Sequence, residues 1–126
     1  MAVTYSTACK TARMNAVVAQ IDAGAGTSTI EIGTAGMASV LAVFDLPDPC
    51  GTVTNGVLTF DMDPDLTDSS ANNDGTAAAA QIKNGDGTAV ITGLTVGTSG
   101  ADINLDSVSI TTGQTVTLTT GSITHA

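Results

Sequence analysis

The sequence predicts an all-β protein, a Greek-key or jelly-roll-like β-sandwich with one short α-helix at its N-terminal end. Three observations support this fold class. Apolar residues recur with a helical period only within residues 6–23, and from Gly24 onward they alternate with polar residues. Turn-forming residues then recur about every ten positions, which divides residues 25–126 into eight or nine short strands. Many short strands of even spacing are typical of sandwiches and barrels.

The predicted helix carries a single apolar stripe at positions i, i+3, i+4 and i+7, formed by Met14, Val17, Val18 and Ile21. Ser6 or Thr7 is expected to cap the start of the helix, and Gly24 is expected to end it. Two interpretations follow. The helix plugs one end of the β-domain, or residues 1–24 form an arm that docks on a partner, and both can hold together.

Lys10 and Arg13 are the only charged side chains within residues 1–21, and they lie away from the centre of the stripe. The rest of the chain holds Lys83 and all twelve acidic residues, so the helix differs chemically from the body. Lys10, Arg13 and the four stripe residues are therefore the candidates for docking on a partner. If the helix is a docking arm, removing residues 1–23 should abolish docking and leave the β-domain folded.

The first strands follow a glycine-rich link. Ile30 and Ile32 share one face of the strand predicted within residues 27–33. Residues 39–46 are apolar on both faces, which predicts a strand that is central or covered on both sides. Pro47 and Pro49 then end that strand, because proline cannot continue the ladder of hydrogen bonds.

Two hairpins are predicted from the middle of the chain. Asn55 and Gly56 separate two alternating runs, which is the signature of a two-residue type I′ turn. In the second run Leu58, Phe60 and Met62 point to one face. A polar loop is expected over residues 63–75.

The second hairpin joins residues 76–83 to residues 88–96 through the turn NGDG. Three further strands are predicted, in ADINL, SVSI and QTVTLTTGSIT. In the last of these, Val116 and Leu118 have one parity and Ile123 the other, so a bulge is predicted at Gly121.

Residues 95–126 contain only two charged side chains, Asp102 and Asp106, and a hydroxyl at almost every second position. Threonine is β-branched and favours strands. Its hydroxyl tolerates both water and a close-packed neighbour. A threonine-rich outer face can therefore pack against another protein without burying charge.

Composition limits the classes of function. The chain has 126 residues and three aromatic ones, Tyr5, Phe44 and Phe60, so its core is small and support from oligomer contacts or from a larger body is expected. A net charge of −9 argues against a nucleic-acid partner, because such partners are bound through Lys and Arg. No apolar stretch reaches membrane-spanning length and no signal peptide is recognisable, so synthesis in the cytoplasm is expected.

Catalytic chemistry finds little support, and neither an enzyme nor a cofactor is expected. The only histidine, His125, lies next to the C-terminus. Cys9 and Cys50 are too few for a disulfide framework, and free thiols are favoured over a disulfide between them. Cys9 has no evident base. Glu31 is the single glutamate, which argues against a glycosidase pair of carboxylates.

The stretch DMDPDLTD gathers carboxylates that suit Ca²⁺, with Asp61, Asp63 and Asp65 as weak candidate ligands. The EF-hand pattern fails, because its glycine and glutamate positions hold Leu66 and Asn72. A solvated acidic loop is the favoured interpretation, and weak Ca²⁺ binding is the alternative.

Three segments resemble a family of small structural proteins of tailed bacteriophages and prophages. They are residues 97–124 (GTSGADINLDSVSITTGQTVTLTTGSIT), residues 4–34 (TYSTACKTARMNAVVAQIDAGAGTSTIEIGT) and residues 75–100 (GTAAAAQIKNGDGTAVITGLTVGTSG). The second of these has the order of a short helix, a glycine-rich link and a first strand.

The resemblance implies a virion protein without enzymatic activity, and above all a capsid decoration (cement) protein. Such a protein binds the outer surface of the head as a homo-oligomer, and its partner is the major capsid protein or another virion protein. From the composition, no nucleic acid, membrane or cofactor is expected as a partner. Two alternatives stay open: a neck, tail or fibre-associated virion protein, and a carbohydrate- or Ca²⁺-binding adhesion module.

Overall fold

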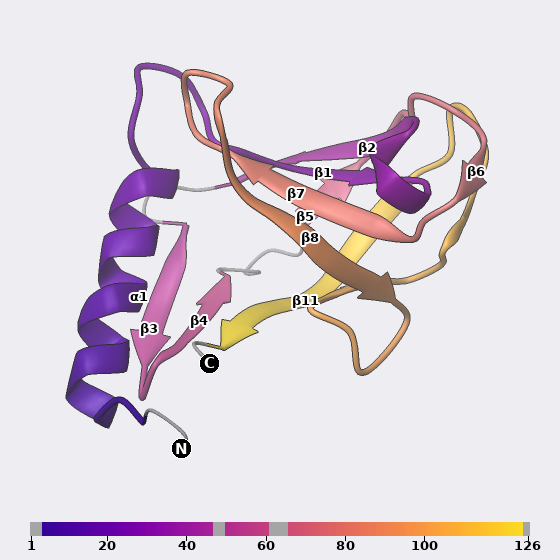
Figure 1. The fold of residues 1–126 in the computed structure, drawn as a ribbon. Coiled ribbons are helices and arrows are strands. Elements are labelled where there is room, and N and C mark those ends of the chain that lie inside the picture. Colours follow the sequence, from indigo (N-terminus) through magenta and orange to yellow (C-terminus); the bar gives the residue numbers. More distant parts are fainter. Residues whose placement is uncertain (1–3, 47–49, 61–65, 125–126) are drawn as a thin grey trace.

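One helix stands at the end of a curled β-sheet in this computed structural model, which describes residues 4–46, 50–60 and 66–124 (Figure 1). The predicted fold class, all-β with a short N-terminal helix, is confirmed. Within the described residues the helices are α1 (Thr7–Ile21) and the short 3-10 helix η1 (Ala35–Met37). The strands there are β1 (Thr29–Gly33), β2 (Val40–Asp45), β3 (Gly51–Thr54), β4 (Val57–Phe60), β5 (Leu66–Asp68), β6 (Gly75–Thr76), β7 (Ala79–Lys83), β8 (Ala89–Gly97), β9 (Ile103–Leu105), β10 (Ser109–Ile110) and β11 (Val116–Thr124).

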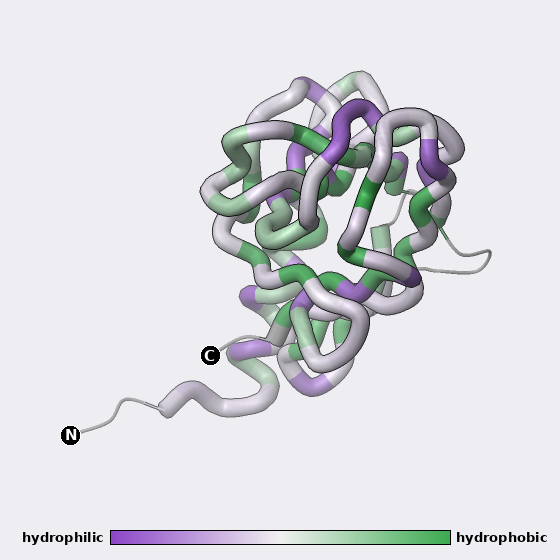
Figure 2. Tube along the Cα trace, turned by 90° about the vertical axis from the view of Figure 1, so that its right-hand side faces the viewer, coloured by the Kyte–Doolittle hydropathy of each residue, from purple (hydrophilic) through white to green (hydrophobic). Residues whose placement is uncertain are grey.

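A single sheet supplies the layers of the fold by curling on itself into a half-barrel. Its strand order is β2-β1-β7-β8-β9-β11-β4-β3, with β5 paired beside β11, while β6 and β10 form a separate ribbon. The curl brings β5 next to β2, where the backbone N–H of Val43 donates to the Asp68 carboxylate at 2.9 Å. Hydrophilic positions are few and separated by long pale stretches, as Figure 2 shows, in keeping with the low content of charged residues.

The last strand turns the sheet by changing partners along its length. Its first half pairs with β5 and β9, and its second half pairs with β4. The register shifts between Leu118 and Thr120, while Gly121 stays in the ladder opposite Ile103. The prediction of a bulge at Gly121 is therefore wrong. The bulge lies two residues earlier, at Thr119, which is the extra residue. Its hydroxyl donates to the Asn104 carbonyl at 3.1 Å, which gives the bulged position a partner.

The first two strands pair as antiparallel neighbours. Ile30 and Ile32 are fully buried on one face of β1, as predicted. Strand β2 buries Leu41 on one face and Phe44 on the other, yet it lies at the end of the sheet and is not central. Its outer edge is covered instead, because β5 lies beside it and the Asn72 N–H donates to the Leu41 carbonyl at 2.7 Å.

Both predicted hairpins are confirmed. Asn55 and Gly56 have φ angles of 52° and 79°, as a type I′ turn requires, and they join β3 to β4. Strands β7 and β8 pair across the second turn. Within the predicted polar loop of residues 63–75, however, Leu66–Asp68 form β5. This strand was missed because its pairing with β11 is long-range and its composition is polar. Met62 lies outside the described residues.

A parallel pair joins β8 to β9 through residues 98–102 alone. Parallel neighbours usually need a connection of about a dozen residues or more. Here the Asp102 carboxylate accepts from the Thr95 N–H and hydroxyl at 3.0 and 3.1 Å. The buried Asn104 side chain donates to the Ala101 carbonyl and to the Thr120 hydroxyl at 3.0 and 2.9 Å. These polar side chains replace the longer crossover.

The link after the helix is held against the turn between β7 and β8. The Gly85 N–H donates to the Ala23 carbonyl at 2.9 Å, and the Gly26 N–H donates to the Gly85 carbonyl at 3.2 Å. A Cβ at Gly26 would lie 2.6 Å from the Gly85 oxygen, so glycine is needed for this close approach of two backbones. The position of the helix is therefore fixed at its C-terminal end.

Candidate functional site

The helix lies against the hairpin formed by β3 and β4 (Figure 1). Its start is capped by Ser6, whose side chain accepts from the Cys9 N–H at 3.1 Å, as predicted. The Gly56 N–H at the tip of the hairpin donates to the Thr11 hydroxyl at 3.0 Å. The helix and the hairpin tip are thus joined by a direct hydrogen bond as well as by packing.

The apolar stripe of the helix faces the chain's own core. Met14 and Ile21 are 2% and 0% exposed, and Val17 and Val18 are half-buried against the same cluster. This packing is what the interpretation of the helix as a plug expects. Docking of a partner on the stripe stays a prediction, and it would require the helix to leave its seat.

The two basic residues of the helix lie in different surroundings. Lys10 is half-buried beside the hairpin tip, where a Cβ at Gly56 would lie 2.8 Å from the Lys10 Cβ. Arg13 is exposed, and its guanidinium lies 4.4 Å from the centre of the Tyr5 ring, in a cation–π contact. A hydrogen bond with Tyr5 raises the pKa of Arg13. Arg13 is therefore the exposed member of the predicted docking set, and Tyr5, which that set did not include, lies beside it.

A second surface lies on the side of the β3–β4–β11 layer that the core does not cover. Paired residues share a face of a sheet, so the register places Thr52, Thr59 and Ser122 in one row and Thr54 and Val57 in the next. All five are exposed or half-buried. We call these residues the threonine face. On the opposite side, Leu58 and Phe60 are buried in the core.

A shallow depression of about 410 Å³ lies on the threonine face between β4 and β11. Its walls are mainly apolar, and its described lining is Val57, Thr59, Phe60 and Thr119–Ser122. None of these lining residues is ionisable. Sequence reasoning foresaw a threonine-rich outer face but did not assign these residues, because the rows form only once β4 pairs with a strand more than fifty residues away. The alternation of threonine with apolar residues in TVTNGVLT was the available signal.

The acidic side chains of the described part serve mainly as acceptors for backbone N–H groups. Both acids of the C-terminal segment do so, because Asp102 accepts from Thr95 and Asp106 accepts from the Thr117 N–H at 3.1 Å. The same role is filled by Asp22 toward Cys50, Asp68 toward Val43 and Asp86 toward Ala25. Each of these carboxylates gives a backbone N–H an acceptor.

No group of three or more metal-ligating side chains gathers within residues 4–46, 50–60 and 66–124. The weak candidates Asp61, Asp63 and Asp65 lie outside these described residues, as does His125. The Ca²⁺ alternative therefore stays a prediction.

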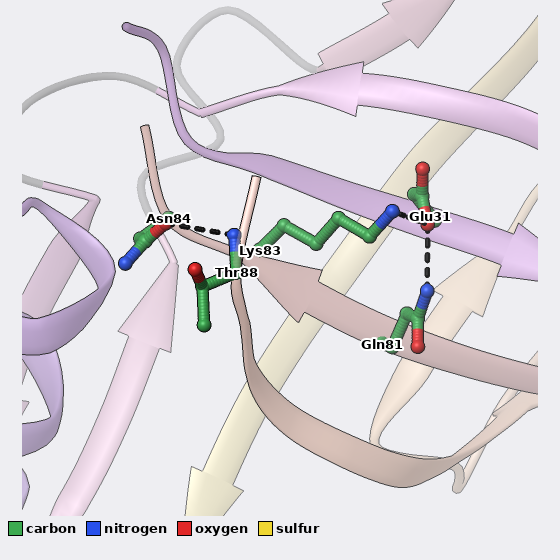
Figure 3. A network of polar contacts seen from close by, with 5 residues as sticks. All are labelled: Glu31, Gln81, Lys83, Asn84 and Thr88. Atoms are coloured by element: carbon green, nitrogen blue, oxygen red, sulfur yellow. Dashed lines mark hydrogen bonds and ion pairs between the residues drawn. The ribbon is translucent and has the colours of Figure 1, made fainter. Parts of the chain in front are cut away.

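Glu31 takes part in a polar network on the outside of β1 and β7 (Figure 3). Its carboxylate lies 3.1 Å from the Lys83 ammonium, and it accepts from the Gln81 amide at 2.7 Å. The ion pair is partly exposed, so its contribution to stability is about 0–1 kcal/mol. Through these contacts Glu31 on β1 is linked to Gln81 and Lys83 on the neighbouring strand β7.

Asp74, which directly precedes β6, is linked to the turn that follows β10. The Thr112 N–H in that turn donates to the Asp74 carboxylate. This hydrogen bond lowers the pKa of Asp74 below its ordinary value of 3.8. The stabilisation is then present above the ordinary pKa and is lost as the pH falls through the lower pKa of the folded protein. Asp74→Asn should lower the melting temperature at pH 7, and the difference from the unmodified chain should shrink below pH 3.8.

Thermal melts over a pH series measure this effect, and Asp45→Asn is the matched control. Asp45 is also an exposed aspartate, but its carboxylate accepts no hydrogen bond within the described part of the chain. A melting difference for Asp74→Asn that stays constant down to pH 2 would contradict the assignment.

Cys9 lies on the surface and Cys50 in the core, and no disulfide joins these two described residues. In the part of the chain that the structure describes, no helix has the length and apolar character needed to cross a membrane.

Comparison with protein-family models, with curated proteins and with solved structures finds no match to this chain.

Proposed function

We propose that this chain is a non-enzymatic structural protein of a tailed-bacteriophage virion, a capsid decoration protein that binds the outer surface of the head as a homo-oligomer. The observation that carries the proposal is the threonine face, a broad surface without ionisable side chains among its described residues on a chain of net charge −9. The resemblance of residues 4–34 and 97–124 to phage structural proteins supports the placement in a virion.

The charge distribution favours contact through this face. Identical copies of an acidic chain repel one another, and burying an unpaired carboxylate is costly. Thr52, Thr54, Val57, Thr59 and Ser122 can enter an interface without either penalty. Copies that associate through the threonine face leave the exposed surface of the helix for the shell.

Attachment to the shell would then use the exposed part of the helix. Arg13 and Tyr5 offer a cation and an aromatic ring on a chain that carries few of either. Arginine and tyrosine are enriched at the energetically dominant positions of interfaces. Several weak contacts of this kind hold an oligomer firmly, because the linked contacts act at a high effective concentration.

Co-sedimentation with bare mature capsids, and separately with tails, of the cognate phage tests the proposal. We expect saturable binding to capsids at a fixed number of copies per shell. Binding to tails alone would favour the neck, tail or fibre alternative and overturn the decoration role. Binding to neither particle would overturn both virion roles and leave the adhesion alternative, for which binding to glycans and to Ca²⁺ would be measured.

Substitution within the threonine face tests the oligomer contact. Thr59→Glu and Thr59→Lys place a charge of either sign at its centre, where an interface would bury it. Each should weaken self-association at least about tenfold, or about 1.4 kcal/mol. Thr92→Lys is the matched control, because Thr92 is an exposed threonine on β8, outside the threonine face. Analytical ultracentrifugation measures the oligomer, and unchanged association of both Thr59 variants would exclude this contact.

A further inference from the structure

The chain contains two Asn-Gly pairs, Asn55-Gly56 and Asn84-Gly85, and both lie in hairpin turns. This dipeptide can react with itself. The glycine backbone nitrogen attacks the asparagine Cγ, the new N–Cγ bond forms, and the Cγ–Nδ2 bond breaks to release ammonia. Water then opens the succinimide ring to give aspartate or isoaspartate. Glycine favours the attack because it has no side chain and a flexible backbone.

Folding protects one of these pairs. The Asn84 side-chain oxygen accepts from the backbone N–H groups of Asp86 and Thr88, each at 3.0 Å, and Figure 3 shows the contact with Thr88. The attacking nitrogen, that of Gly85, donates to the Ala23 carbonyl at 2.9 Å. Gly85 also lies so close to Gly26 that a Cβ on either glycine would collide with the backbone of the other. Hydrogen bonds therefore restrain both the Asn84 side chain and the Gly85 nitrogen that would attack it.

The other pair, Asn55-Gly56, is restrained by fewer hydrogen bonds. Asn55 is exposed, and its side chain has no hydrogen bond within the described part of the chain. Its φ of 52° belongs to the sparsely populated left-handed region. Gly56 is buried against Lys10, and its nitrogen donates one hydrogen bond, to the Thr11 hydroxyl at 3.0 Å. Opening the hairpin tip therefore breaks fewer hydrogen bonds than opening the turn at Asn84.

We propose that Asn55 is a site of spontaneous deamidation in the folded protein, whereas Asn84, with the same following residue, is protected. The reaction has a structural consequence. Isoaspartate adds a methylene to the main chain within a two-residue turn that has no room for it. The displaced Gly56 then loses its contact with Thr11 and its packing against Lys10, so conversion loosens the seat of the helix.

The test is to incubate the full chain at pH 8 and 37 °C and to follow both sites by peptide mapping, in which conversion raises a peptide's mass by about 1 Da. Asn55 should convert at least about tenfold faster than Asn84. That ratio corresponds to about 1.4 kcal/mol, which is the scale of one or two hydrogen bonds. In denaturing urea the two sites should convert at similar rates, because both asparagines precede glycine.

A variant separates the local contact from general flexibility. Thr11→Val removes the acceptor of the Gly56 N–H and keeps the side-chain shape, so it should speed conversion at Asn55 and leave Asn84 unchanged. Equal rates at the two sites in the folded protein would overturn the proposal. So would an Asn55 that stays intact in the folded chain over the time in which the urea-unfolded chain converts.

Discussion

Phe44→Ala is expected to lower the free energy of unfolding by about 3–5 kcal/mol, the usual cost of removing a buried phenylalanine ring. Phe44 is fully buried and is one of only two phenylalanines in the chain. Its neighbours in the core are mainly aliphatic side chains fixed in strands, which cannot move far enough to fill the cavity. Domains of this size are stable by about 5–15 kcal/mol, so the variant loses a large share of its stability.

Denaturation in urea measures the change, and Tyr5→Ala is the control. Tyr5 is also aromatic, but it is 40% exposed and lies outside the core, so its replacement should change the unfolding free energy by less than about 1 kcal/mol. A loss below about 1.5 kcal/mol for Phe44→Ala would contradict the burial of this ring in the core.

The features predicted correctly from sequence are those that local signals specify. Ser6 caps the helix, the Asn55-Gly56 turn forms the first hairpin, and the alternation of Ile30 with Ile32 identifies the face of β1 that is buried. In each case the residues that carry the signal lie within a few positions of the structure they form. Propensity and periodicity are informative at that range.

The features that were missed depend on pairing between distant segments. Strand β5 is polar and becomes a strand only beside β11, and the parallel pair of β8 and β9 depends on the side chains of Asp102 and Asn104. The bulge lies at Thr119 because that hydroxyl reaches the Asn104 carbonyl. No local pattern distinguishes such residues from ordinary surface threonine or asparagine.

The same division applies to the candidate sites. The helical stripe follows from a 3.6-residue period, and the structure places its four members together. The period does not say whether those residues face the chain itself or a partner. The threonine face was foreseen only as a composition, because its rows require the register of β3, β4 and β11.

Ile21→Ala is expected to be the most informative substitution in the helix. Ile21 is fully buried in the core, with 0% of its surface exposed to water. It is the last residue of the helix, at the point where the helix meets the link. Replacement should lower the free energy of unfolding by about 2–5 kcal/mol. Gln20→Ala is the matched control, since Gln20 is the exposed preceding residue and alanine favours the helix.

The result bears on how docking can be tested. If Ile21→Ala destabilises the whole chain in one transition, the helix is part of the domain's core. Removing residues 1–23 would then uncover the part of the core against which the helix packs and unfold the hairpin beneath, so loss of docking after the deletion would say nothing about the helix surface. Arg13→Glu, which changes an exposed residue, becomes the proper test of attachment. A loss below about 1 kcal/mol for Ile21→Ala would instead show that the helix leaves its seat easily, and the stripe would then be free to dock on a partner.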